Sequence, residues 1–140
     1  MTLETELGRL RQSLNDRAAM GEMLEAKREM EHFVSFTTLR EATAACAHFE
    51  RAGFSTDSSA GQDDEGRFPI RVYREQSMDA HSAEQSLRTV YDITRKHNGV
   101  YEDFGAVAIM PEGSRPAGFF SRLLGRETED GENPWIQRSP

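Results

Sequence analysis

Several features are scarce or absent in this 140-residue sequence, and each absence excludes a class of protein. A single cysteine, Cys46, excludes an internal disulfide and any multi-cysteine metal site. No run of about 18 apolar residues occurs, so we expect no membrane-spanning segment. The first residues also lack the basic and apolar pattern of a secretory signal. We therefore expect a cytoplasmic protein with no membrane association.

Basic residues are also in the minority. The sequence has 17 Lys and Arg against 24 Asp and Glu, a net charge of −7. The excess is concentrated in residues 29–110, which hold eight basic and fourteen acidic side chains. Proteins that bind nucleic acid directly place Lys and Arg against the phosphate backbone, so this balance disfavours a nucleic-acid partner. It is compatible with attraction to a basic surface of a partner.

Patterns typical of catalysis are missing as well. No glycine-rich phosphate-binding loop follows a predicted strand, and no two of the four histidines have the spacing that places two metal ligands on one helical face. The acidic run at Asp63, Asp64 and Glu65 lacks the regular oxygen-ligand spacing of a cation-binding loop. Cys46 is expected to be a core thiol rather than a nucleophile. We predict a non-enzymatic protein with no catalytic residues, no metal and no cofactor.

Hydrophobic patterning divides the chain into three regions. Residues 1–28 are predicted to form an N-terminal helix over 3–19 and a loop, and residues 29–110 a folded domain. Residues 111–140 contain too few apolar side chains to order themselves, so we expect a flexible tail.

The folded domain is predicted to alternate strands and helices. Strands are expected over 29–36, 54–58, 68–73 and 100–110. One helix begins at a capping box formed by Thr38 and Glu41, and a second begins after Asp79 or at Ser82. This order predicts an α+β fold, specifically a ferredoxin-like βαββαβ sandwich whose four-stranded antiparallel sheet has two helices on one face.

The same patterns predict which side chains face the core. The first strand should bury alternate residues, and the helices should bury residues at spacings of three and four. The expected core positions are Met30, His32, Val34 and Phe36 in the strand, Leu39, Ala42, Cys46 and Phe49 in the first domain helix, and Ala83, Leu87, Val90 and Thr94 in the second.

The N-terminal helix carries a stripe of four leucines that must pack on something, because an isolated helix of this length is marginal in water. It either packs on its own domain or mediates self-association as a homodimer. Phe33 and Tyr73 are predicted to point outward from the sheet, as base-stacking aromatics do in RNA-recognition domains. The sequence lacks the basic residues of that motif, so we expect the leucine stripe (Leu3, Leu7, Leu10 and Leu14) to cover these aromatics instead.

Four short motifs together resemble the regulator of ribonuclease activity B (RraB) family. They are Met30-Glu31-His32-Phe33, Ala52-Gly53-Phe54, Ser77-Met78-Asp79 and Gly99-Val100-Tyr101-Glu102-Asp103-Phe104-Gly105. Phe104 stands where the family typically has a tryptophan. The resemblance implies a non-enzymatic protein that binds ribonuclease E and lowers its activity, thereby altering messenger RNA decay.

Two acidic segments are the candidate partner-binding residues. The first is Tyr101, Glu102, Asp103 and Phe104, and the second, Asp63, Asp64 and Glu65, would supply charges at the rim. Tyr101 and Phe104 are equally well explained as core anchors, and the acidic run as a solvated loop. His32 is expected to be a buried histidine rather than a contact. The alternative function is an acidic protein-interaction module of the same fold with a different partner.

Overall fold

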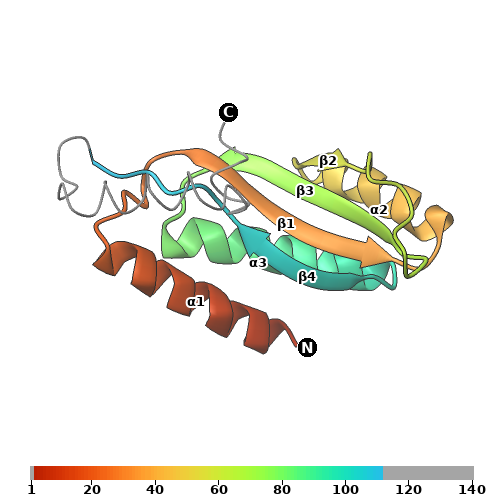
Figure 1. Ribbon diagram of the computed structural model, residues 1–140, viewed down its shortest axis with the longest axis horizontal. Helices are drawn as coiled ribbons and strands as arrows, with labels where there is room; N and C mark the ends of the chain where they lie inside the picture. The colour runs from red at the N-terminus through yellow and green to blue at the C-terminus, as the bar shows by residue number, and fades with distance from the viewer. Residues whose placement is uncertain (1, 112–140) are drawn as a thin grey trace.

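The computed structural model describes residues 2–111, which form three helices and one four-stranded sheet. The elements follow one another along the chain and are drawn in Figure 1. They are α1 (Leu3–Ala19), β1 (Arg28–Phe36), α2 (Leu39–Arg51), β2 (Ser55–Asp57), β3 (Phe68–Gln76), α3 (Ala80–Lys96) and β4 (Val100–Gly105). The expectation of an α+β fold with a four-stranded antiparallel sheet is confirmed.

Each helix begins at a side chain that caps a free backbone N–H group. Thr2 accepts a hydrogen bond from the Thr5 amide at 3.2 Å, and Thr38 accepts one from the Glu41 amide at 3.1 Å. Asp79 accepts from the Ser82 amide at 3.2 Å, so α3 begins directly after Asp79. Local sequence therefore sets all three helix starts.

The end of α3 requires two special residues. Asn98 adopts a left-handed conformation with a φ of 62°, which turns the chain out of the helix. At Gly99 an added Cβ would lie 2.4 Å from the Phe36 ring, so only glycine permits this close approach of the turn to β1. The Asn98-Gly99 pair thus ends α3 and lets β4 begin beside β1.

The strands lie in the order β2-β3-β1-β4, and all three pairings are antiparallel. The helices α2 and α3 pack on one face of this sheet, and no described helix covers the other face, called the open face below, which is turned toward the viewer in Figure 1. The predicted inward residues of β1 and α3 are all buried: Met30, His32, Val34, Phe36, Ala83, Leu87, Val90 and Thr94.

The helix α2 buries a different stripe from the predicted one. Leu39 is 63% exposed and Cys46 is only partly buried, whereas Ala45 is completely buried. The observed stripe of Ala42, Ala45 and Phe49 shares two members with the prediction, so the helix is rotated slightly about its axis. Helical spacing alone permits both stripes, and packing against the sheet selects the one with the small Ala45 side chain.

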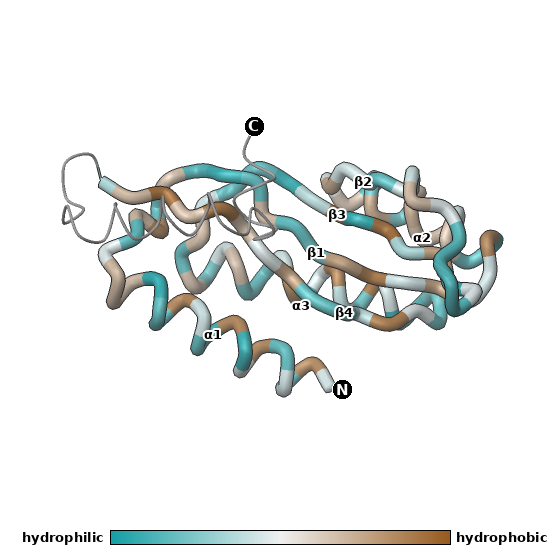
Figure 2. Tube along the Cα trace, viewed as in Figure 1, coloured by the Kyte–Doolittle hydropathy of each residue, from teal (hydrophilic) through white to brown (hydrophobic). Residues whose placement is uncertain are grey.

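The helix α1 packs on its own domain, but not where we expected. It lies against α3, beyond the β4 edge of the sheet (Figure 1), rather than across Phe33 and Tyr73. Figure 2 shows hydrophobic positions recurring along α1 between hydrophilic ones. Of these, Leu7 and Leu10 are completely buried within the single chain. The leucine stripe is therefore occupied inside the protein and is not a free surface for self-association.

The last strand is shorter than predicted. It ends at Gly105, and the chain then runs beside the loop between α1 and β1, where the Met23 amide donates to the Ile109 carbonyl at 2.8 Å. Arg28 is 4% exposed and binds both segments, since it pairs with Glu22 and donates to the Val107 carbonyl. These contacts replace the strand pairing expected for residues 106–110. The predicted flexible tail lies outside the described residues, apart from its first residue.

Candidate functional site

A β-bulge determines which residues of the Tyr101–Phe104 segment face outward. In the pairing of β1 with β4, Phe33 is opposite Asp103 and Val34 is opposite Tyr101. Glu102 is therefore an extra residue in β4 that has no residue of β1 opposite it. A bulge of this kind re-aims the side chains on either side of it. Glu102 consequently lies exposed on the open face. The alternation of side chains between the two faces of the sheet is shifted by one residue between the part of β4 before the bulge and the part after it.

The two aromatic residues of the segment face the core side. Tyr101 is 3% exposed, and Phe104 is a partly buried residue packed against the core. Tyr101 is too deeply buried to touch a partner, so its place in the candidate site is corrected to that of a core anchor beneath Glu102. Phe104 is only partly buried, so part of its side chain remains accessible to solvent.

Tyr101 is anchored by a buried hydrogen bond. Its hydroxyl lies 2.7 Å from Nδ1 of His32, and the two rings meet edge to face. Burial, with a smaller contribution from Arg74, lowers the pKa of His32 to about 3, and burial also raises the pKa of Tyr101. Both groups are therefore neutral at physiological pH, and His32 is the buried histidine we expected rather than a contact residue.

The two predicted acidic segments come together through a chain of hydrogen bonds. The Ser35 hydroxyl donates to Oε2 of Glu102 at 2.6 Å, and the Arg67 guanidinium donates to the same hydroxyl at 2.8 Å. The backbone amide of Arg67 donates in turn to Oδ1 of Asp63 at 2.8 Å. Residues separated by about forty positions in the sequence thus belong to one connected surface.

These residues border a shallow hollow on the open face. Its volume is about 460 Å³, and its lining combines apolar side chains with the carboxylates of Asp57, Asp63 and Glu102. Hydrogen bonds from Ser59 lower the pKa of Asp57, which keeps this group charged. Asp64 and Glu65 are exposed beside the hollow but do not line it. The predicted rim therefore consists of Asp63 at the edge and two more distant charges.

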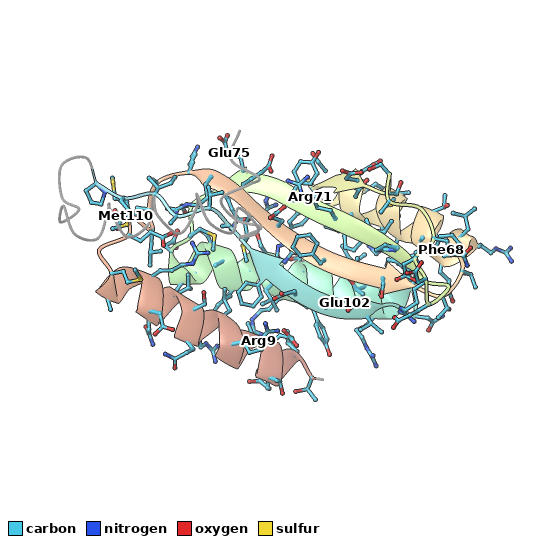
Figure 3. All side chains as sticks on the ribbon, in the orientation of Figure 1. Arg9, Phe68, Arg71, Glu75, Glu102 and Met110 are labelled. Carbon is cyan, nitrogen blue, oxygen red and sulfur yellow. The ribbon has the colours of Figure 1, made fainter. Side chains whose placement is uncertain are left out.

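Among the residues that the structure describes, Arg71 is the only arginine or lysine lining the hollow, and it already has partners. It forms ion pairs with Glu29 and Glu31, and its guanidinium lies 3.9 Å from the centre of the Tyr73 ring. Figure 3 shows Arg71 on β3 and Glu102 on β4 across the same face. Because its charge is offset by two carboxylates, the face as a whole remains acidic.

Asp103 is bound at the edge of this surface by a residue of α1. Arg9 Nη2 lies 3.0 Å from Asp103 Oδ1, and the same guanidinium lies 5.4 Å from the centre of the Phe104 ring. The Phe104 amide also donates to Asp103 Oδ1 at 2.8 Å. The second half of the predicted segment is thus partly covered by α1.

Sequence reasoning missed several residues of this site. Asp57, Arg67 and Ser35 belong to three separate segments, and only the sheet pairing brings them together. For Ser35 and Asp57, polar character within a strand was a signal, because strand residues opposite the core face are solvent-facing. Arg67 lies directly before β3 and offered no such signal. Arg9 had no such signal, since its contact with Asp103 joins residues 94 positions apart.

The carboxylates of this surface come from three segments: Asp57 lies in β2, Asp63 lies in the loop before β3, and Glu102 and Asp103 are adjacent in β4. Within residues 2–111, no hydrogen bond joins any of these four to a histidine or a cysteine. Over the same residues, no group of three or more His, Cys, Asp or Glu side chains is placed to hold a metal ion. None of the described helices is long and apolar enough to cross a membrane.

A comparison with protein families identifies the relationship. The family model described as "Regulator of ribonuclease activity B" matches residues 10–106, more than half of the chain. The chain belongs to the RraB family. Its family is therefore one of regulators of ribonuclease activity, and both acidic segments of the candidate site lie within the matched residues. A comparison with curated proteins gave no match.

Proposed function

We propose that this RraB family member binds ribonuclease E and lowers its activity without chemistry of its own, thereby modulating messenger RNA decay. The observation that carries the proposal is the convergence of the two acidic segments on one hollow of the open face. The family relationship supports a regulatory role, and the acidic surface supports binding to a basic segment of a protein. The proposed contacts are Glu102, Asp103, Phe104 and the Asp63–Glu65 loop, with Tyr101 as their support.

The expected partner segment is rich in arginine and extended. Planar guanidinium groups pair with carboxylates in two-pronged geometry and stack on aromatic rings, and this surface offers both. A segment that lacks a stable fold can follow a shallow surface of this kind, although it loses conformational freedom on binding. Charged surfaces of this type mainly accelerate association and select the correct partner.

Two further proposals concern the setting of this function. We propose that residues 28–105 have the ferredoxin-like topology, supported by their βαββαβ order and by the strand order β2-β3-β1-β4. We also propose that the protein acts in the cytoplasm and without direct contact to nucleic acid, because an acidic face repels phosphate. Homodimer formation, if it occurs, would use a surface other than the leucine stripe.

The test is a titration of the purified protein into a defined ribonuclease E cleavage assay. We expect inhibition by the unmodified protein and a loss of at least about tenfold in potency for the variant Glu102→Lys/Asp64→Lys, with a weaker dependence on salt. The matched control is Glu25→Lys/Asp92→Lys, which makes the same change in net charge at exposed positions outside the hollow.

The outcomes separate the candidate functions. Equal potency of the two double variants would contradict the proposed surface. Absence of inhibition by the unmodified protein, together with tight binding to an arginine-rich peptide, would favour the alternative of an interaction module with another partner.

A further inference from the structure

We infer that Asp103 and Phe104 form a subsite for an arginine side chain, and that Arg9 of α1 fills this subsite until an arginine of the partner displaces it. The inference rests on the proposed function, because it concerns how that surface binds and what sets its affinity. It assigns a ligand group to the subsite and a competing group within the same chain.

The contacts of Arg9 show how the subsite receives a guanidinium. Arg9 Nη2 forms an ion pair with Asp103 Oδ1 at 3.0 Å, and the guanidinium carbon lies 5.4 Å from the centre of the Phe104 ring. A carboxylate beside an aromatic ring binds a guanidinium better than an ammonium group, because only the planar group both pairs and stacks. The subsite is therefore selective for arginine.

A second arginine on the sheet lies over an aromatic ring and pairs with carboxylates in the same way, but this arginine belongs to a strand and is not replaced by another. Arg71 lies over Tyr73 and pairs with Glu29 and Glu31, and its side chain is 25% exposed. Arg71 belongs to a central strand of the same sheet. Arg9 comes from a helix outside the sheet, and its side chain is 42% exposed, so it can move away while the sheet stays intact.

The helix α1 stays in place when Arg9 leaves the subsite. Leu7 and Leu10 are completely buried, and Arg11 forms two hydrogen bonds with Glu84 of α3 at 2.9 and 3.0 Å. Arg9 also donates from Nη1 to Oε1 of the buried Glu6 at 2.8 Å. This second contact holds the guanidinium near the subsite, so Arg9 competes at a high effective concentration.

The subsite adjoins the hollow where the partner is proposed to bind. Asp103 follows Glu102 directly in β4, and Arg9 on α1 pairs with Asp103, so the subsite lies next to Glu102 along the strand; Figure 3 labels Arg9 and Glu102. A basic segment lying in the hollow therefore brings a neighbouring arginine to the edge occupied by Arg9. Because the partner's arginine must displace Arg9, the contact contributes less net free energy to binding. The contacts of Arg9 therefore set the affinity of the whole surface.

The test compares two variants of α1 with the same loss of charge. The probes are a synthetic arginine-rich peptide and a lysine-rich peptide of equal length and charge, with binding followed by fluorescence anisotropy. We expect Arg9→Gln to bind the arginine peptide about three- to tenfold more tightly than the unmodified protein, because it removes the competing ion pair with Asp103 and the ring contact with Phe104. It also removes the ion pair with the buried Glu6, so the stability of the variant is measured alongside its binding. Arg11→Gln removes an arginine that does not touch the subsite, so its smaller gain should be equal for both peptides.

Further variants keep the test decisive. Adding Asp103→Asn to Arg9→Gln should abolish the extra gain, and Arg9→Lys should show a smaller gain than Arg9→Gln because the lysine retains the charge. Thermal unfolding of each variant establishes that α1 is still docked. Equal tightening by Arg9→Gln and Arg11→Gln, or equal gains for the two peptides, would overturn the subsite.

Failure of this inference is distinguishable from failure of the proposed function. Inhibition of ribonuclease E by the unmodified protein, with no difference between the two α1 variants, would reject the subsite and leave the function standing. A selective gain for Arg9→Gln without any inhibition of the nuclease would support the subsite and reject ribonuclease E as the partner.

Discussion

The two faces of the sheet differ in chemical character. The face covered by α2 and α3 is apolar and contains the buried pair His32 and Tyr101, whose groups are neutral. The open face carries carboxylates that are exposed or bound to arginines, around a hollow of about 460 Å³. The same strands supply both faces, because successive side chains of a strand point in opposite directions.

This difference separates stability from binding. Changes on the covered face remove buried apolar contacts or leave polar groups without partners, and both are costly. Changes on the open face alter exposed charges, whose contribution to stability is small. The two faces should therefore respond differently to substitution.

The largest effect should come from the covered face. Phe49 is completely buried in α2, and Phe49→Ala should lower the free energy of unfolding by about 3–5 kcal/mol through lost transfer energy and a cavity. Chemical denaturation monitored by circular dichroism measures this change. A loss below about 1 kcal/mol would mean that α2 is not part of the core.

An intermediate effect should come from the buried histidine. Burial lowers the pKa of folded His32 to about 3, whereas the unfolded residue has a pKa of about 6.5. Between these values the unfolded chain binds a proton that the folded chain excludes, so stability falls as pH decreases. We expect a loss approaching about 1.4 kcal/mol per pH unit between pH 6 and pH 4.

The variant His32→Met isolates this contribution, because it places an uncharged side chain at the buried position and removes the titrating group, although it also removes the hydrogen bond to Tyr101. Its unfolding free energy should depend less steeply on pH than that of the unmodified protein over the same range. Parallel curves for the two proteins would show that the pKa of His32 is the same in the folded and unfolded states.

The smallest effect on stability should come from the open face. Glu102→Gln keeps an acceptor for the Ser35 hydroxyl but removes the charge, so the free energy of unfolding should change by less than about 0.5 kcal/mol. Binding of an arginine-rich peptide should weaken several-fold and become less sensitive to salt. Strong destabilisation by this substitution would contradict the expectation that the open face contributes little to the free energy of unfolding.

Much of the fold was predictable because it depends on local patterns. The helix over residues 3–19, the capping residues Thr38 and Asp79 and the alternation in β1 all depend on neighbours within a few positions. The docking of α1 was not predictable, since a leucine stripe specifies that a surface is buried and not which surface covers it. The choice between Cys46 and Ala45 in α2 depended in the same way on packing against the sheet.

The candidate site was predictable in part. Acidic character identified Glu102 and Asp63, but no sequence pattern indicated that Ser35 and Arg67 connect them. The bulge at Glu102 also reversed the expected alternation after Tyr101, because it inserts one residue without a partner into β4. Tyr101 thereby became a support for the surface rather than a part of it.

The sequence by itself determined the order and type of the helices and strands, the acidic balance and the family of this protein, because these follow from residue type and short-range spacing. Only the tertiary structure decided which charges share a surface, which aromatic residues are accessible and where α1 lies. Those properties depend on contacts between residues as far apart as Arg9 and Asp103, and such contacts exist only once the sheet and helices have packed together.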